Sequence, residues 1–400
     1  GMSGLLVKST MVMKENLEVM NERSLKIPVI LGGAALTKRY VDNDLRPLYN
    51  GKVYYANDAF DGLRFMEALA GGGAEPSRVQ KKNIVVDAEA LTGSEAKIAL
   101  ALARGEADAR AETGASTGRS KVNAAEKIPR PPFWGSRVNR DIPLEEVFEY
   151  INEAALIRGQ WRVIRGAMDE KEYRQVLEDQ VYPDYRQLKE KVKRENLLVP
   201  QVAYGYFPCQ SDGNDLVVYH PPGNHGEVDP KDLREWQRFS FPRQVKDRRL
   251  CIADFFAPVQ SGIVDVLSCH LVTVGERASE FARKLYDANN YKDYLYFHGL
   301  SVETAEALAE SWHKRIREEL GIAGKDAQEI KRLFSQGYQG ARYSFGYPAC
   351  PRLEDQVKLF DMLKPDRIGV FLTEEFQMEP EQSTSAIIVH HPEARYFTIV

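Results

Sequence analysis

The first seventy residues alternate between short apolar runs and stretches of helical periodicity. Residues 11–23 place Met13, Leu17 and Met20 on one side of a helix, because they are spaced by three and four positions. Alternating strands and helices indicate a parallel α/β sheet, and three strands are too few for a complete doubly wound domain. We therefore expect the second half of a Rossmann-like domain. The predicted strands are 5–7, 27–31 and 53–55, and the predicted helices are 11–23, one starting near Ala34, and roughly 59–70.

Gly32 and Gly33 directly follow the second predicted strand. In a parallel sheet, ligands bind at the carboxyl ends of the strands, and glycine lets a ligand approach the backbone closely. A tight turn from strand to helix explains the same pair equally well, so both interpretations stay open.

Residues 74–130 are rich in Ala, Glu, Lys and Arg and contain few large apolar side chains. This composition is typical of an exposed helix or a mobile linker. The proline-rich segment 129–134 ends the pattern and opens the next domain. We expect a partial α/β domain over 1–72, a helical or flexible linker over 73–130, and a second domain over 131–400.

The second domain mixes helical periodicity with strand-like runs separated by turn residues. Its pattern indicates an α+β domain with a central antiparallel sheet and flanking helices. The predicted helices are 144–160, 172–195, 276–289, 301–320 and 353–363. The predicted strands are 202–207, 216–219, 239–241, 250–256, 264–272, 368–372 and 386–389.

The predicted helix 301–320 carries two stripes of side chains. One stripe is apolar and predicts the buried face. The other contains Glu303, Glu306, Glu310, His313 and Arg317. It is either a solvated face with paired charges or a source of carboxylates for a ligand ammonium or hydroxyl.

Residues 338–351 hold four aromatic residues, two glycines, two prolines and Arg342. Pro348 and Pro351 exclude a regular helix, and Gly340 and Gly346 allow tight bends. The segment is predicted to be extended and kinked. A fixed cation among aromatic rings suits a flat, anionic ligand, although a structural loop sealed by aromatic side chains has the same composition.

The composition narrows the class of protein. A length of 400 residues exceeds one ordinary domain, and a net charge of -4 gives no basic footprint for nucleic acid. No apolar run reaches the length of a membrane span, and the N-terminus lacks a signal peptide. Four separated cysteines indicate free thiols and a cytoplasmic protein. No HxxxH pair, GxSxG, P-loop or GxGxxG is present, so a metal site is not expected and three common enzyme classes lack their motif.

The segment from Arg342 to Pro351, with GYPACP at 346–351, resembles the reactivation-domain signature of the cobalamin-dependent methionine synthase family. The resemblance extends over nearly the whole chain and keeps the family's order. The other matching segments are SGLL at 3–6, ILGGA at 30–34, VYYAN at 53–57, YIN at 150–152, CIADF at 251–255, the helix with Glu306 and His313, and HHPEARYF at 390–397.

This resemblance implies a domain that binds S-adenosylmethionine and remethylates oxidised cobalamin, with an electron from flavodoxin or another reductase. It implies that Arg342 pairs with the ligand carboxylate, that Glu306 accepts from the ammonium, and that Tyr347 is the catalytic residue facing the corrin. The remaining implied contacts to S-adenosylmethionine are Asn152, Gly346, Ala349 and Tyr396, and the implied contacts to cobalamin are Ser3, Gly32 and Gly33.

The sequence departs from the family pattern in three respects. The DxHxxG motif that supplies the lower cobalt ligand does not occur, so we expect the chain to start after it and to bind cobalamin poorly by itself. Asn152 stands where some relatives have aspartate, and Val302 and Gln336 stand where some have acidic residues. The methyltetrahydrofolate and homocysteine modules are missing too. The chain alone is therefore not expected to make methionine, and its partner is the rest of the synthase or a separate corrinoid protein.

Two other functions remain open at this point. The chain can be a non-catalytic docking module for a corrinoid protein or flavodoxin, with a degenerate ligand groove, or a stand-alone S-adenosylmethionine methyltransferase with another acceptor. The docking module is distinguished from the reactivation module by two measurements: binding of S-adenosylmethionine and capture of a separate cobalamin-binding protein.

Overall fold

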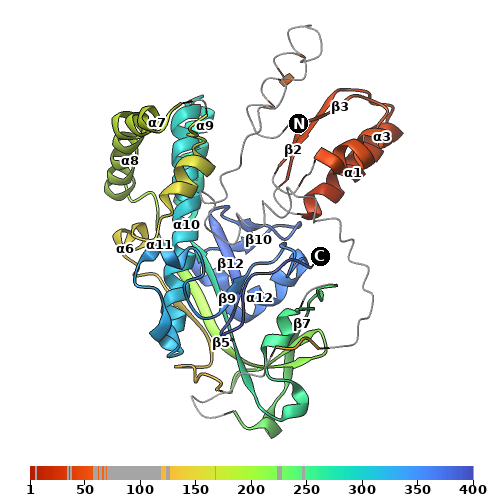
Figure 1. The fold of residues 1–400 in the computed structure, drawn as a ribbon, viewed down its shortest axis with the longest axis vertical. Helices are drawn as coiled ribbons and strands as arrows, with labels where there is room; N and C mark the ends of the chain where they lie inside the picture. Colours follow the sequence, from red (N-terminus) through yellow and green to blue (C-terminus); the bar gives the residue numbers. More distant parts are fainter. Residues whose placement is uncertain are drawn as a thin grey trace.

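The computed structural model contains an N-terminal α/β unit and a larger C-terminal domain (Figure 1). The residues that the structure describes are 1–4, 7–33, 36, 38–56, 62, 65–66, 69, 119–122, 127–166, 168–222, 228–245 and 248–399.

The N-terminal unit is a three-stranded parallel sheet in the order β1-β2-β3, as the alternating pattern predicts. The first helix places Met13 and Leu17 in its core, and Met20 packs against them. The strands are β1 Met2–Ser3, β2 Val29–Gly32 and β3 Val53–Tyr55, and the helical segments are α1 Val7–Glu22, α2 Lys38–Tyr40, η1 Val41–Leu45 and α3 Arg46–Leu48.

The first strand was placed too late by the apolar pattern. Residues 2–3 pair with β2, Gly4 still donates its backbone N–H to the carbonyl of Gly32 at 3.2 Å, and Val7 already begins α1. Residues 5–6 and the predicted start near Ala34 lie outside the described residues, as do most of the predicted helix 59–70 and most of the predicted linker 73–130.

The C-terminal domain is built on a seven-stranded sheet in the order β7-β6-β5-β8-β12-β9, with β4 also paired to β5. Every strand pair in it is antiparallel, so the predicted α+β architecture is confirmed. The strands are β4 Gly135–Asn139, β5 Gln201–Asp212, β6 Asp215–Tyr219, β7 Glu235–Ser240, β8 Asp265–Thr273, β9 Ala341–Tyr343 and β12 Ser383–Val389; a separate hairpin pairs β10 Phe371–Leu372 with β11 Met378–Glu379.

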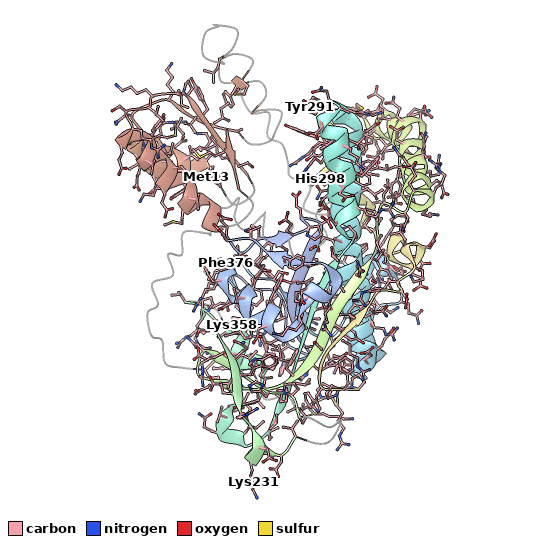
Figure 2. All side chains as sticks on the ribbon, turned by 180° about the vertical axis from the view of Figure 1, so that it is seen from behind. Met13, Lys231, Tyr291, His298, Lys358 and Phe376 are labelled. Atoms are coloured by element: carbon pink, nitrogen blue, oxygen red, sulfur yellow. The ribbon has the colours of Figure 1, made fainter. Side chains whose placement is uncertain are left out.

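Two layers cover the faces of this sheet. The long helix α10 (Tyr291–Glu319) packs on one face together with α9 (Glu276–Asp287) and the helical segments from 144 to 194. The short helix α12 (Gln356–Leu363) and the C-terminal residues cover the other face. Side chains of β8 alternate between these two cores, and all its residues are buried. Figure 2 shows that the start of α10, with Tyr291 and His298, extends beyond the sheet.

The predicted helix 144–160 is interrupted. The structure has α6 Leu144–Phe148 and a π-helix η2 Ala155–Gln160, separated by the segment that contains Asn152. The predicted helix 172–195 is one helical run made of α7 Glu170–Val176, η3 Leu177–Val181 and α8 Tyr182–Arg194.

Two predicted strands are wrong. Residues 250–256 contain the 3-10 helix η5 Ile252–Phe255, and residues 368–372 hold the end of η9 Pro365–Ile368 and only the two-residue strand β10. Residues 250–256 are buried throughout, and Ile368 and Val370 are the buried residues of the second run. A short apolar run thus marks burial without fixing the backbone conformation. Strand β4, which pairs with β5, was not predicted. Its residues are mostly half-buried and form no apolar run.

No helix in the described parts of the chain is both long and apolar enough to cross a membrane. All four cysteines are free thiols with buried side chains.

Gly340 sets the entry of the chain into β9. Its φ is +89°, and a Cβ placed there would lie 2.4 Å from the carbonyl oxygen of Val389. We expect Gly340→Ala to lower the free energy of unfolding by at least about 2 kcal/mol, because it adds a clash to an unfavourable φ. Gly369→Ala is the matched control, since its φ is +72° with no atom within 4 Å of the added Cβ, and it should cost about 1 kcal/mol. Equal losses in denaturant titrations of the two variants would contradict the steric argument.

Candidate active site

The residues of the 338–351 segment are held by the edge strand β9. This strand pairs with β12, and Arg342 lies opposite Ile388, whose side chain is in the core beneath α10. Because side chains alternate along a strand, Arg342 points to the α10 face, whereas Ala341 and Tyr343 are in the core on the opposite face. The pairing register therefore decides which face of the sheet receives the cation.

Arg342 meets a carboxylate from α10. The Nη2 atom of Arg342 lies 3.2 Å from Oε2 of Glu310, and the two side chains are 18% and 7% exposed. Charges at this depth interact more strongly than at a solvated surface, because less water screens them. Glu306, which the resemblance singled out, lies one turn earlier on the same helix and is half-buried. Glu310 is the carboxylate that sequence reasoning did not select.

The polar stripe of α10 is not a solvated face. Glu303, Glu310, His313 and Arg317 are all buried, with 7%, 6%, 0% and 0% of their surface exposed. Arg317 is paired with Asp326 at 2.7 Å and lies over the ring of Tyr338, with its Cζ 4.0 Å from the ring centre. The interpretation of this stripe as paired surface charges is therefore wrong.

Two neutral histidines lie beside the Arg342–Glu310 pair. Burial lowers the pKa of His270 on β8 and of His313 on α10 well below the ordinary value, and the positive charge of Arg342 lowers both further. Arg317 adds to the effect on His313. Within the described residues, the ring nitrogens of both histidines are buried without a hydrogen-bond partner. Both histidines are therefore uncharged, so neither adds a second positive charge beside the Arg342 guanidinium.

The GYPACP segment forms a tight turn directly after β9. Gly346 donates its N–H to the carbonyl of Cys350 at 2.8 Å, and Cys350 donates to the carbonyl of Tyr347 at 2.8 Å. Gly346 has a φ of +92°, a conformation that glycine adopts without strain. Ala349 is buried inside the turn and Tyr347 is half-buried. The predicted segment is therefore extended over β9 and kinked in the turn that follows it.

The C-terminal segment brings Tyr396 to this turn. The hydroxyl of Tyr343 donates to the carbonyl of Arg395 at 2.8 Å, and the rings of Tyr343 and Tyr396 stack with centres 6.4 Å apart. Burial raises the pKa of Tyr396, and the neighbouring thiol of Cys350 raises it further. The hydroxyl oxygen of Tyr396 is buried and has no hydrogen-bond partner among the described residues. A polar group of a ligand is one partner that would satisfy it.

Asn152 has a clear local role. Its Oδ1 accepts from the N–H of Ala155 at 3.2 Å, as is usual for Asn at the start of a helical turn, and its own N–H donates to Oε1 of Glu303 at 3.3 Å. The structure therefore ties Asn152 to the α10 helix through Glu303, a residue that the resemblance did not select.

The site residues of the C-terminal domain thus gather around β9, on two faces. Arg342 and Glu310 lie on the α10 face, and Tyr396 packs against Tyr343 on the other. A family model described as "Vitamin B12 dependent methionine synthase, activation domain" matches residues 143–400. The chain belongs to this family.

The known relatives agree with the family model. The chain is 44% identical over 419 residues to the methionine synthase of Mycobacterium tuberculosis and 42% identical over 423 residues to that of Mycobacterium leprae. Both matches cover 100% of the chain and 34% of the relative, so the chain spans about a third of the length of these curated relatives. The expected resemblance to methionine synthase is confirmed.

A solved structure supports the same fold. The chain is similar to a protein described as the MetH reactivation domain bound to AdoHcy, with a TM-score of 0.60 and 25% sequence identity. The similarity covers 68% of this chain and 84% of that one. The mixed fold with a central antiparallel sheet is therefore the fold of an activation domain.

The N-terminal unit of this activation-domain chain places its three predicted cobalamin contacts at one sheet edge. Ser3 lies opposite Gly32 in the parallel register, and Gly33 follows with a φ of +110°. A Cβ on Gly33 would lie 2.2 Å from the carbonyl oxygen of Gly4. The close approach of two backbone segments therefore explains Gly33 without a ligand, and its role toward cobalamin stays a prediction.

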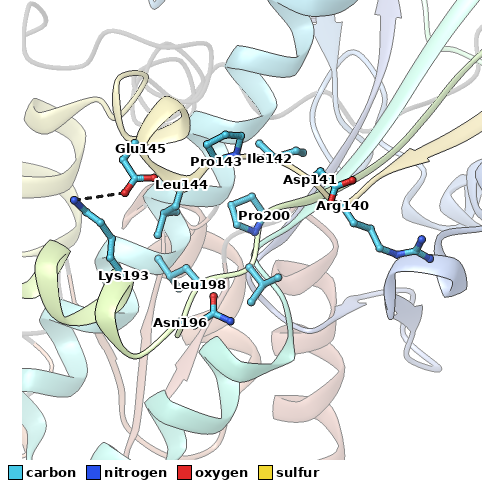
Figure 3. A pocket seen from close by; sticks show the side chains of 11 residues that line it. Arg140, Asp141, Ile142, Pro143, Leu144, Glu145, Lys193, Asn196, Leu198 and Pro200 are labelled. Atoms are coloured by element: carbon cyan, nitrogen blue, oxygen red, sulfur yellow. Dashed lines mark ion pairs between the residues drawn. The ribbon is translucent and has the colours of Figure 1, made fainter.

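A hollow of about 510 Å³ lies away from all of these residues, where the chain passes from β4 to α6 and from α8 to β5 (Figure 3). Lys193 and Glu145 form an ion pair at one side of it, with Nζ 3.7 Å from Oε1. Its other lining residues are Arg140, Asp141, Ile142, Pro143, Leu144, Asn196, Leu198, Val199 and Pro200. None of the predicted site residues lines it.

The buried histidines predict how stability depends on pH. Their folded-state pKa values lie below the unfolded value of about 6.5, so the unfolded chain binds protons that the folded chain does not. Stability should therefore fall as pH drops below about 6.5, by as much as about 1.4 kcal/mol per pH unit for each histidine. Denaturant titrations at pH 7.5, 6.5 and 5.5 should show a shallower fall for His313→Gln than for the wild type. If the free energy of unfolding of His313→Gln fell with pH as steeply as that of the wild type, the argument would be contradicted. His220→Gln is the control, because His220 is exposed.

Proposed function

We propose that this chain binds S-adenosylmethionine along the edge strand β9 and supports the reductive methylation of oxidised cobalamin in methionine synthase. The Arg342–Glu310 pair, fixed beside the GYPACP turn, carries this proposal. The AdoHcy named for the similar reactivation domain differs from S-adenosylmethionine by one methyl group and supports the same ligand class here.

The amino-acid end of the ligand is assigned to the α10 face. Arg342 pairs with its carboxylate, because a guanidinium offers parallel N–H donors that match two carboxylate oxygens. Glu306 accepts from its ammonium, since it is half-buried on the same helix one turn before Glu310. Asn152 and Glu303 close this end of the site, joined by their 3.3 Å hydrogen bond.

The adenosine end is assigned to the turn after β9. Gly346 and Ala349 lack bulky side chains, so backbone groups can approach the ribose and adenine. Tyr396 covers this end, and its buried hydroxyl, which has no partner among the described residues, meets a polar atom of the ligand. The ligand then runs past the edge strand β9, with its amino-acid end on one face of the sheet and its adenosine end on the other.

The chemistry asked of these residues is positional. Tyr347 stands in the turn between the two ends and is assigned to the sulfonium, on the side that faces the corrin. Cobalamin, when bound and reduced, supplies the cobalt nucleophile that accepts the methyl group. The protein holds the sulfonium methyl in line and releases S-adenosylhomocysteine. Flavodoxin or another reductase supplies the electron.

The cobalamin contacts fit this chain only in part. Ser3 and Gly32 lie at the carboxyl edge of a parallel sheet, where ligands of this fold class bind. No histidine precedes His220 in the sequence, so the N-terminal unit cannot supply an imidazole to cobalt. We assign residues 1–72 to part of a cobalamin domain and 131–400 to the activation domain, with the rest of methionine synthase or a corrinoid protein as partner.

We also assign the chain to the cytoplasm. Its four thiols are free and buried, which fits a reducing compartment.

The role of Arg342 predicts a loss of affinity. Arg342→Ala removes the carboxylate partner, and a charged hydrogen bond contributes about 1.5–3 kcal/mol, so calorimetric titration with S-adenosylmethionine should give a Kd raised roughly 10- to 100-fold. Arg352→Ala is the control, because Arg352 is exposed and lies 3.8 Å from the carboxylate of Asp355, which is not a predicted site residue. An affinity unchanged by Arg342→Ala would remove Arg342 from the site.

We assign Glu310 the role of positioning the Arg342 guanidinium, and this role predicts a separate effect on the affinity for S-adenosylmethionine. Glu310→Gln keeps the shape but removes the charge that orients the guanidinium, so the Kd should rise about 3- to 10-fold, and Glu310→Ala should raise it further. Glu319→Gln is the matched control, because Glu319 is on the same helix and accepts from the hydroxyls of Tyr204 and Tyr206. It should lower stability and leave the Kd unchanged. Tighter binding by Glu310→Gln would show that Glu310 competes with the ligand instead of positioning Arg342.

A further inference from the structure

A short basic segment ahead of the second domain lies on the surface of that domain. The Nη2 atom of Arg119 donates to the backbone carbonyls of Asp254 and Phe256, both at 2.8 Å, and its Nη1 donates to Oγ of Ser211 at 3.2 Å. Three acceptors from two separate elements, β5 and the η5 region, thus converge on one guanidinium.

The residues after Arg119 are held as well. The N–H of Ser120 donates to Oδ2 of Asp254 at 3.1 Å. Val122 is 6% exposed and belongs to the core beneath α12, whereas Lys121 points to solvent. Contacts of three kinds, a charged side chain, a backbone amide and an apolar side chain, therefore fix this segment.

The groups that receive the segment are buried and are hydrogen-bonded to other residues of the domain. Asp254 is 1% exposed and accepts two hydrogen bonds from Arg243, one of them at 2.9 Å between Nη2 and Oδ1. Burial alone would raise the pKa of Asp254, but hydrogen bonds from Arg243 and Ser120 outweigh it, and the pKa lies below its ordinary value. Ser211 is 1% exposed, and its hydroxyl donates to Phe256 at 3.0 Å. The acceptors are thus in place through contacts that do not involve Arg119.

We propose that Ser211, Asp254 and Phe256 form a docking site for residues 119–122, which act as an intramolecular latch. The planar guanidinium is the group that this arrangement selects, because its donors diverge at fixed angles toward several acceptors at once. The latch fixes the carboxyl end of the linker to the activation domain. The described contacts of the activation domain therefore include residues 119–122, which precede the predicted boundary at 131.

The CIADF segment at 251–255 acquires a role from this proposal. The Ile252–Phe255 turn presents the Asp254 carboxylate to Ser120 and leaves the carbonyls of Asp254 and Phe256 for Arg119.

Hydrogen–deuterium exchange on the full chain without ligand tests the latch. The amide of Ser120 is expected to exchange slowly in the wild type and at least 10-fold faster in Arg119→Ala. Lys121→Ala is the matched control, because it removes the same charge type from the same segment at an exposed position, and it should leave the exchange of Ser120 unchanged. Peptides from β8 should be unaffected in every variant.

Two results would overturn the proposal: exchange of the Ser120 amide at the rate of an unstructured peptide in the wild type, or an unchanged rate in Arg119→Ala. If Arg119→Ala also accelerates the β8 peptides, Arg119→Lys decides. Lysine keeps the charge but lacks the fork, so it should still speed exchange at Ser120 several-fold while β8 stays protected. An exchange rate in Arg119→Lys equal to the wild type would contradict the assignment to the guanidinium.

Discussion

The ion pair between Arg342 and Glu310 joins the edge strand of the sheet to its longest helix, and the arrangement of the site depends on it. Arg342 reaches α10 only because β9 pairs with β12 in the register that places it opposite Ile388. That register is in turn constrained by Gly340, whose backbone approaches Val389 too closely for a side chain. A glycine, a strand register and a helix face thus converge on the position of one guanidinium.

The surroundings of this pair explain why the arginine stays available as a positive charge in a buried place. A buried cation is costly unless it is paired, and Glu310 supplies the charge within 3.2 Å. The histidines beside it, His270 and His313, remain neutral because burial and the arginine charges disfavour their protonation. Arg342, Glu310 and the two neutral histidines therefore carry no net charge together. S-adenosylmethionine brings a carboxylate, an ammonium and a sulfonium, so it adds one positive charge, which the half-buried carboxylate of Glu306 on the same helix offsets in this account.

Much of the fold follows from the sequence pattern, since α10 carries a long periodic run and β5 and β8 are long runs with β-branched and aromatic residues, although both strands are buried on both faces. The pattern fails at the shorter buried run 250–256, because a short apolar run has no period that distinguishes a strand from a helical turn. In the site, Arg342 and the GYPACP turn were identified from motif residues. Glu310 was not distinguished from Glu306, because the choice between carboxylates one helical turn apart depends on the height at which a distant strand crosses the helix. That height is set by non-local pairing and leaves no local signal.

The most direct test of the account is a crystal structure of this chain with S-adenosylmethionine. The account predicts the ligand carboxylate within about 2.7–2.9 Å of the Arg342 guanidinium, the usual length of such a charged hydrogen bond, with the adenosine beside Gly346 and Ala349. A ligand bound elsewhere, or one whose carboxylate points away from Arg342 while the Arg342–Glu310 pair is intact, would contradict it.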